Sequence, residues 1–359
     1  MTAPRVALGM TLHNNAAHLP RALDSLLAQT HRTFVLALLD DASSDDTPQI
    51  CRDYAARDSR IRYHRHASRQ AMIATWRGVV DIAARECPSA EYYAWVSDHD
   101  IWDPRWLERL MVELDADREA VLAYPMTRRV TPGGAVIDKD PRLFDTAAFG
   151  DVHDRWKAFC RDVVGAGDMV YGLMRLDALR RAGTFRTVLR PDRLLIAELT
   201  LQGRIRQVQE ELWFRRQSSA TSVSRQRTTL LLPDAAPWWF SWAPWLQHSV
   251  VLWREYASPV PPPFPITRAQ WLGMLLRYQV AYGWKGFRKT DLSHLVERTA
   301  GRVWWSRKLV AHYARHTLYR TLVGARIARG RLRRAAKRVL YEVLVLTHRL
   351  GLRGRRQTP

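Results

Sequence analysis

Residues 34–48 read FVLALLDDASSDDTP, a run of six apolar residues that ends in two aspartates and a loop rich in Ser and Asp. An apolar run of this length is typical of a strand that is buried on both faces. Asp46, Thr47 and Pro48 place cap-type residues and then proline where a helix should begin. The stretch therefore predicts a strand, an acidic loop and a helix start, which is the repeating unit of a parallel α/β sheet.

The same unit recurs on both sides of this stretch, over roughly the first 125 residues. The predicted strands are residues 6–11, 34–39, 61–64, 92–96 and 120–124. The predicted helices are residues 19–27, a helix that starts near 46, 71–84 and 106–114. We therefore predict an α/β fold with a Rossmann-like, mostly parallel sheet flanked by helices.

A hairpin and a second α/β stretch are predicted further along the chain. A turn at Pro132, Gly133 and Gly134 separates two short extended segments, 127–130 and 135–137. A glycine-bounded loop that leads to a strand, a helix and a late strand follow at 163–175, 192–201 and 208–214. We predict a catalytic domain over residues 1–227 and a mainly α-helical, Trp-rich and basic region over 228–359, with a Pro-rich break at 259–265.

Charge and tryptophan are concentrated in the C-terminal region. Residues 301–359 hold 16 Lys or Arg and one acid, Glu342, and so carry +15 of the net charge of +21. Nine of the 15 tryptophans lie beyond Leu230. This composition suits an anionic phospholipid surface or a nucleic acid, and it suits a solvated basic helix equally well. No nucleic-acid-binding motif is visible, so nucleic acid is not the expected partner.

The cysteine content and the apolar segments indicate the cellular compartment in which the protein is expected. Three cysteines without C-x-x-C spacing favour a reducing compartment, and residues 1–15 contain too short an apolar run for a secretory signal. The most apolar segment, residues 271–284, carries Arg277 in its middle. We expect a cytoplasmic protein, with peripheral attachment to the inner face of the plasma membrane as one hypothesis. The alternative is a helical cap that packs on the catalytic domain.

Polar side chains follow three of the predicted strands, at residues 11–14, 40–45 and 97–100. Ligands of parallel α/β sheets gather beyond the carboxyl ends of the strands. Asp98 and Asp100 could reach one hard cation that neutralises a diphosphate, or they could cap the turn before Pro104. Asp41 could accept a hydrogen bond from the imino N–H of uracil or thymine, with helix capping as the alternative.

These pieces together resemble the glycosyltransferase family 2 pattern over roughly the first 225 residues. The residues that carry the resemblance are Thr11-x-x-Asn14, the run from Asp40 to Asp45, and Asp98-x-Asp100 before Ile101-Trp102. The resemblance implies a GT-A fold and a nucleotide-diphosphate sugar donor, with UDP or dTDP favoured over GDP. It also implies Mn²⁺ or Mg²⁺ and an inverting single-displacement transfer.

The resemblance also implies roles for individual residues near the donor. In the nucleotide-sugar site it places Thr11, His13 and Asn14 around the nucleotide and Asp41 at the base. Asp98 would approach the ribose or the metal, and Asp100 would be the main metal ligand. Many relatives read D-x-D-D here, whereas this chain has Asp98-His99-Asp100. His99 is therefore a further candidate for the metal or a phosphate, or a residue that faces solvent.

An inverting transfer needs a general base beside the acceptor hydroxyl. The family places an Asp at the start of a late helix, and Asp192 matches that position, although Pro191 replaces the usual preceding acid. Helix capping is the alternative role for Asp192, and Glu198 is the reserve base.

Glycines and basic residues complete the predicted site. Gly167 and Asp168 would form the floor where sugar and acceptor meet, and Asp168 could bind a sugar hydroxyl or serve a turn. Arg216, with Arg215, could meet the leaving diphosphate or be part of an exposed basic pair.

The Q-x-x-R-W motif of processive family members is absent. The resemblance therefore favours a non-processive hexosyltransferase that acts on a cell-envelope glycan or a lipid-linked acceptor. A non-catalytic nucleotide-binding or membrane-surface scaffolding protein on the same fold is the alternative. The short acidic motif and Pro191 are the observations in its favour.

Overall fold

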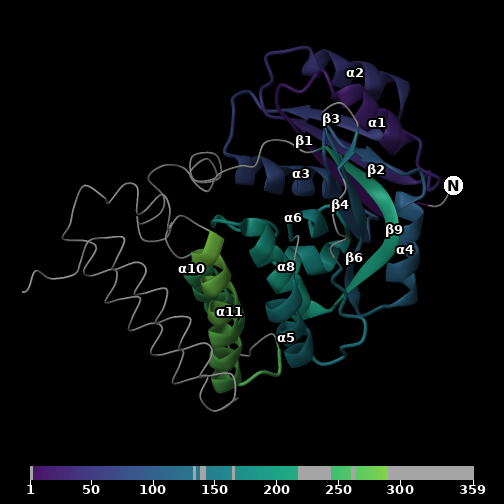
Figure 1. Ribbon diagram of the computed structural model, residues 1–359. Coiled ribbons are helices and arrows are strands. Elements are labelled where there is room, and N and C mark those ends of the chain that lie inside the picture. Colours follow the sequence, from purple (N-terminus) through teal and green to yellow (C-terminus); the bar gives the residue numbers. More distant parts are fainter. Residues whose placement is uncertain are drawn as a thin grey trace, which may run out of the picture. The chain divides into compact units, whose positions relative to one another are not determined.

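The computed structural model describes residues 3–131, 135–137, 143–163, 166–216, 244–259 and 264–289. These residues form a sheet of nine strands with helices on both faces (Figure 1). The strands are β1 (Val6–Leu12), β2 (Phe34–Asp40), β3 (Ile61–Arg65), β4 (Tyr92–Val96), β5 (Ile101–Trp102), β6 (Ala120–Val130), β7 (Val136–Ile137), β8 (Leu173–Arg175) and β9 (Arg204–Arg216). Their order is β3-β2-β1-β4-β8-β6-β9-β5, with β7 paired to β6. The predicted α/β class is confirmed.

The helices connect the strands and continue beyond the sheet. They are α1 (Leu19–Leu27), α2 (Thr47–Arg57), α3 (Met72–Glu86), α4 (Trp106–Ala116), α5 (Val152–Asp162), α6 (Ala166–Met169), α7 (Leu176–Arg181), α8 (Pro191–Gln202), α10 (Pro244–Leu252), the π-helical turn η2 (Trp253–Ala257) and α11 (Arg268–Lys289). Residue contacts divide the chain into two units, residues 1–285 and 286–359, and the first unit contains the sheet.

The strand directions place six carboxyl ends at one edge of the sheet, those of β1, β2, β3, β4, β6 and β9. β1 pairs in parallel with β2 and β4, with Thr11 opposite Leu39 and Met10 opposite Val96. β8 is antiparallel to both β4 and β6, so β6 regains the direction of β4. β9 then runs parallel to β6. The loops after β1, β2 and β4 therefore share an edge with the ends of β6 and β9.

The apolar run of β2 is buried on both sides of the sheet. Val35, Ala37 and Leu39 lie in the hydrophobic core with α3, α5, α8 and α11. The alternate residues, such as Leu36 and Leu38, lie in a second core with α1 and α4. Successive side chains of a strand point to opposite faces, so a strand covered on both faces needs a continuous apolar run.

Strands β6 and β9 are longer than predicted, and three helices of the first unit were not predicted. β6 and β9 pair as far as Val130 opposite Arg216, so Arg216 lies inside a strand and not beyond one. The predictions stopped where the apolar runs stop, whereas charged side chains such as Arg128 and Glu211 pair across the strands. The helices α5 and α7 were not predicted, and α6 lies inside the predicted loop at 163–175.

The pairing of β6 with β7 confirms the predicted hairpin, with Arg129 opposite Ile137. Its turn, residues 132–134, lies outside the described residues. Gly165, the predicted domain end at Arg227, the tryptophans at 238–242, most of the Pro-rich break and the basic tail at 301–359 also lie outside them. The domain boundary stays a prediction.

Helices α10 and α11 pack on the unit that contains the sheet. Trp156 of α5 donates from Nε1 to the carbonyl of Met274 at 2.9 Å, and Tyr282 donates to the carbonyl of Phe159 at 3.0 Å. The guanidinium of Arg193 in α8 lies 4.3 Å from the ring centre of Tyr282. Residues from α10 and α11 are thus part of the core. Among the helices described, none combines the length and apolar content needed to span a bilayer.

A buried histidine joins α10 to this core and predicts acid sensitivity. His248 donates from Nε2 to the carbonyl of Leu189 at 2.7 Å, and its Nδ1 accepts from the hydroxyl of Tyr278 at 2.6 Å. Burial lowers the pKa of His248 to about 4. Because the unfolded chain protonates near the ordinary pKa, the free energy of unfolding should fall as pH drops from about 6.5 to about 4, by roughly 3 kcal/mol.

Urea denaturation at several pH values measures this loss. The variant His248→Gln should be less stable at neutral pH but should lack this part of the pH dependence. The matched variant His153→Gln, in the first turn of α5, should keep it because His248 is still present. An unchanged slope in His248→Gln would show that other groups cause the acid sensitivity.

Candidate active site

The loops after β1, β2 and β4 are joined by hydrogen bonds. Nδ1 of His13 lies 3.0 Å from the carbonyl oxygen of Asp41, and Asn15 donates from Nδ2 to the carbonyl of Asp98 at 3.2 Å. The structure thus brings together three of the predicted site segments. Thr11 lies just before them in β1, opposite Leu39, and is partly buried.

Asn14 ties the first loop to the second. Its amide N–H donates to Oγ of Ser43 at 3.0 Å, and its Oδ1 accepts from the N–H of Ser44 at 2.7 Å. Its φ of 50° is in the left-handed region, which Asn tolerates better than most residues. Asn14 therefore shapes the predicted nucleotide pocket, and its direct contact with a nucleotide stays a prediction.

The two adjacent aspartates after β2 differ in their surroundings. Asp40 is fully buried and accepts hydrogen bonds from the hydroxyl of Tyr63 and the N–H of Ser43, both at 2.9 Å. Asp41 accepts through Oδ1 from the N–H of Gln70 at 2.8 Å, and the same oxygen lies 3.0 Å from Nδ1 of His66. Its Oδ2 has no hydrogen-bond partner in the described part of the chain and could accept one from a base.

The acidic motif after β4 holds a histidine between two carboxylates. Nδ1 of His99 lies 2.7 Å from Oδ1 of Asp98, and Nε2 lies 3.8 Å from Oδ1 of Asp100. Asp100 is 1% exposed and accepts a hydrogen bond from the N–H of Arg216 at 2.8 Å. His99 is therefore part of the motif and does not simply face solvent.

Burial and charge shift the pKa values in this motif. Burial raises the pKa of Asp100 above its ordinary value, although His99 and the N–H of Arg216 oppose the shift. Burial alone lowers the pKa of His99, but the hydrogen bond to Asp98 and the charge of Asp100 outweigh burial and raise it. A divalent cation beside Asp100 would favour the ionised form of this carboxylate.

The donor atoms of the motif suit a cation that is shared with a substrate. In the ranges that the structure describes, no group of three or more His, Cys, Asp or Glu side chains could hold a metal by itself. Mg²⁺ usually takes one or two carboxylates from a protein and fills its remaining positions with phosphate oxygens and water. Asp98 and Asp100 fit that pattern, with His99 as a third candidate.

A second cluster surrounds Asp168 in α6. Asp168 is 6% exposed, and Nη2 of Arg129 lies 2.9 Å and 2.7 Å from its two carboxylate oxygens. Arg215 also pairs with Asp168 and donates to the carbonyl of Gly167 at 3.2 Å. Arg215 is therefore not part of an exposed basic pair. Two guanidinium groups already bind the carboxylate of Asp168, so this carboxylate has a structural role. The same carboxylate would also have to bind the sugar hydroxyl that the sequence predicts for it.

Asp192 lies beside this cluster, in the first turn of α8. A Cβ atom built on Gly167 would lie 3.3 Å from Oδ2 of Asp192, so the missing side chain leaves room next to the carboxylate. Arg190, the residue before the helix, has a φ of 53° and makes no side-chain cap. Asp192 accepts no hydrogen bond from any described residue, so the capping alternative is not seen there.

Glu198 does not fit the role of reserve base. It is fully buried, and its Oε1 accepts from Nη2 of Arg186 at 2.9 Å and from the hydroxyl of Tyr256 at 3.1 Å. Burial raises the pKa of Glu198 to about 8, although Arg186 opposes that shift. A carboxyl in this position joins α8 to η2 and does not face an acceptor.

Strand β9 connects the two acidic clusters. Arg216 contacts Asp100 through its backbone, and its neighbour Arg215 contacts Asp168 through its side chain. The sequence had not singled out Arg129 or Tyr171. The guanidinium of Arg215 lies 5.8 Å from the ring centre of Tyr171, whose pKa is raised by burial. The sequence could have indicated Arg129 as a site residue, because it is a charged residue near the carboxyl end of a strand that begins with buried apolar residues.

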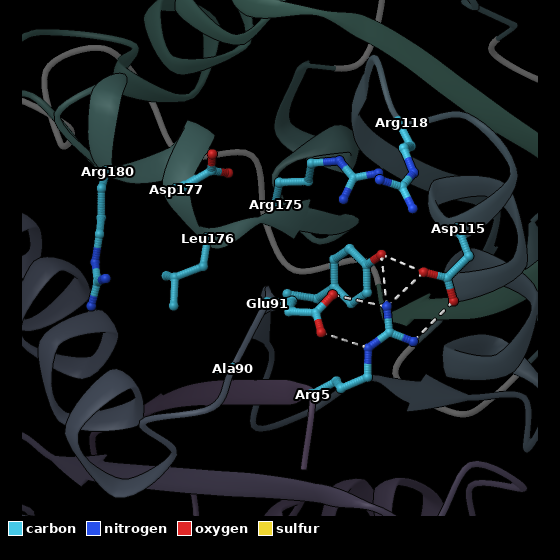
Figure 2. A pocket seen from close by; sticks show the side chains of 10 residues that line it. Arg5, Ala90, Glu91, Asp115, Arg118, Arg175, Leu176, Asp177 and Arg180 are labelled. Atoms are coloured by element: carbon cyan, nitrogen blue, oxygen red, sulfur yellow. Dashed lines mark hydrogen bonds and ion pairs between the residues drawn. The ribbon is translucent and has the colours of Figure 1, made fainter. Parts of the chain in front are cut away.

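A pocket at the opposite edge of the sheet does not belong to this site (Figure 2). Arg5 precedes β1 and pairs with Glu91 at 2.9 Å and with Asp115 at 2.7 Å. Arg175 donates to the carbonyl oxygens of Ala120 and Leu114 at 2.8 Å and 2.6 Å. Both arginines therefore bind structural partners at the amino ends of the strands.

An open α/β sheet with acidic loops and a separate carboxylate at one edge has a candidate ligand site at the carboxyl ends of its strands. Residues 8–145 match the family model described as "Glycosyl transferase family 2". Residues 8–145 therefore carry a likeness to family 2 glycosyltransferases.

Known proteins support this likeness. EpsE of Bacillus subtilis (strain 168), which is assigned as a glycosyltransferase, is 25% identical over 206 residues, 56% of this chain and 67% of EpsE. Protein CgeD of the same organism is 26% identical over 123 residues, and the chain spans only 28% of its length. The crystal structure of Staphylococcus aureus TarS 1–349 with UDP-GlcNAc superposes with a TM-score of 0.56 at 12% identity, over 81% of this chain and 77% of TarS. At this low identity, the superposition shows that the present chain and TarS have similar folds.

Proposed function

We propose that the protein transfers a sugar from a nucleotide-diphosphate donor to an acceptor hydroxyl, with a divalent cation and with inversion at the anomeric carbon. The observation that carries the proposal is the connection of the two acidic clusters through β9. Asp100 binds the backbone of Arg216, while Arg215 binds Asp168 next to Gly167 and Asp192. Strand β9 thus joins Asp100 of the acidic motif to the cluster beside which Asp192 lies.

The donor would lie across the loops after β1, β2 and β4. The free Oδ2 of Asp41 would accept from the imino N–H of uracil or thymine, which favours UDP- or dTDP-sugars. TarS, which has a similar fold, was solved in complex with UDP-GlcNAc, and this supports a nucleotide-sugar donor for the present chain. Asp100 and Asp98 would hold Mn²⁺ or Mg²⁺, which when bound neutralises the diphosphate and makes it a better leaving group.

Asp192 would act as the general base. It takes the proton of the acceptor hydroxyl while that oxygen forms a bond to the anomeric carbon from the face opposite the diphosphate. The bond from the anomeric carbon to the diphosphate oxygen breaks, and its electron pair leaves with the nucleoside diphosphate. Gly167 lets the acceptor approach the carboxylate closely because no side chain fills that space.

The acceptor is proposed from the chemistry of family members without the processive motif. One sugar or a few would be added to a cell-envelope glycan or a lipid-linked acceptor on the cytoplasmic side, with the protein attached peripherally to the membrane. The second candidate is a non-catalytic nucleotide-binding protein, and the observation in its favour is Pro191 in place of an acid. Turnover of a bound donor separates the two.

A thermal-shift screen of nucleotide sugars, each with Mn²⁺ and with EDTA, tests the donor and the metal together. A ligand at about 100 times its Kd stabilises the native state by about 2.7 kcal/mol. In a protein of this size we expect the matching donor to raise Tm by roughly 5 °C or more with Mn²⁺ and by much less with EDTA. Equal shifts under both conditions would contradict metal dependence, and no shift with any donor would contradict the proposed function.

A further inference from the structure

Helices α10 and α11 carry an unusual share of exposed apolar side chains. Among the described residues, five of the nine exposed large hydrophobic side chains lie on these two helices. We call these five the apolar face: Leu246, Val250, Leu272, Leu276 and Val280. The opposite side of α11 is buried against the protein through Trp271, Tyr278 and Tyr282. Each helix therefore has a packed side and an exposed apolar side.

The apolar face is shared by two helices that contact each other. Within each helix its members are four residues apart, so they form a row along one side. Gln279 of α11 donates from Nε2 to the carbonyl of Trp245 in α10 at 2.9 Å and also binds the hydroxyl of Ser249. On α10, Leu246 and Val250 come directly after Trp245 and Ser249 in the sequence. On α11, Leu276 and Val280 lie before and after Gln279. The two helices therefore lie side by side, and each row includes a residue next in the sequence to one that makes this contact (Figure 1).

The charged residues of the two helices that carry the apolar face are all cations. α10 has no charged residue, and α11 has five Arg or Lys but no Asp or Glu. Arg268 and Arg277 are exposed. The single acid in η2, Glu255, is already paired with Arg254 at 2.9 Å and with Arg186 at 3.2 Å. An apolar surface bordered by cations is complementary to the headgroup region of an anionic membrane.

We propose that the apolar face of α10 and α11 docks in the plane of an anionic phospholipid bilayer. The five apolar side chains enter the boundary between headgroups and acyl chains, and Arg268 and Arg277 contact lipid phosphates. The packed side of α11 stays on the protein, so the helix pair lies on the membrane surface. The inference rests on the peripheral attachment included in the proposed function and gives it a place in the fold, whereas sugar transfer itself is not needed for it.

Vesicle co-sedimentation of the full chain tests the proposal. Wild-type protein should bind phosphatidylcholine vesicles that contain phosphatidylglycerol and should bind pure phosphatidylcholine much more weakly. The double variant Leu276→Glu and Val280→Glu should lose at least about tenfold in binding, because two buried carboxylates replace apolar contacts near anionic lipid. Both positions are 64% exposed, so the fold should tolerate the changes.

Val112→Glu is the matched control, since Val112 is an apolar residue of α4 that is 51% exposed. It should bind vesicles as the wild type does, and circular dichroism should show that all variants are folded.

Wild-type binding by the double variant, or absence of binding by the wild type, would overturn the proposal. So would a dimer in solution that the double variant disperses, because a second copy would then cover the face. If only deletion of residues 290–359 abolishes binding, the tail and not this face is the anchor. Donor-induced thermal shifts report the proposed function separately.

Discussion

Replacing Asp192 by Asn should lower the rate of sugar transfer by about 10²–10⁴, which is the usual contribution of a general base. Asn keeps the size of the side chain but cannot accept the acceptor proton. The loss should fall on kcat, because Asp192 lies beside Gly167 and not in the loops that would hold the nucleotide. Nucleoside diphosphate release from the donor found in the thermal-shift screen measures the rate, and the Tm shift by that donor should be unchanged.

Asp177→Asn is the control for a simple effect on a helix. Asp177 is the second residue of α7 as Asp192 is the second residue of α8, and it pairs with Arg181 at 2.7 Å. Both variants lose one negative charge from a first helical turn, so both should lose a similar, small amount of stability. Only Asp192→Asn should lose transfer. Full activity in Asp192→Asn would remove this residue from the mechanism.

The strands and the meeting of their loops were predictable because they depend on patterns that are local in the sequence. A run such as 34–39, apolar at every position, can only be a strand covered on both faces or a buried helix, and its length favours the strand. Parallel strands then bring their carboxyl ends together whatever lies between them. The hydrogen bonds from His13 to Asp41 and from Asn15 to Asp98 follow from that rule.

The surroundings of charged residues were not predictable in this way. Arg215 looked like one of two exposed cations, but β9 continues through it and directs its side chain to Asp168. Glu198 looked like a reserve base because it follows Asp192 on the same helix. It is buried because η2, more than 50 residues later, places Tyr256 against it. Contacts between distant segments decide whether a charge is paired, and the sequence pattern around the charge does not record them.

Replacing Asp100 by Asn should abolish the Mn²⁺-dependent part of donor binding. Asp100 is 1% exposed, so its charge is poorly screened by water and interacts strongly with a nearby cation. Its Oδ1 accepts from the N–H of Arg216 at 2.8 Å, which orients the carboxylate. We expect at least a tenfold rise in the Kd for donor with Mn²⁺, or about 1.4 kcal/mol, and no change with EDTA.

Asp103→Asn is the matched control, because Asp103 lies in the same segment but accepts from the N–H of Arg105 at 2.9 Å and pairs with its guanidinium. It should bind the donor as the wild type does. Asp98→Asn then shows how the metal is shared: a loss equal to that of Asp100→Asn means that both carboxylates bind it. If only Asp100→Asn weakens donor binding with Mn²⁺, then Asp98 mainly orients His99, whose Nδ1 lies 2.7 Å from Oδ1 of Asp98. Unchanged Mn²⁺ dependence in both variants would place the cation elsewhere, and the acidic pair would then be a turn that the histidine stabilises.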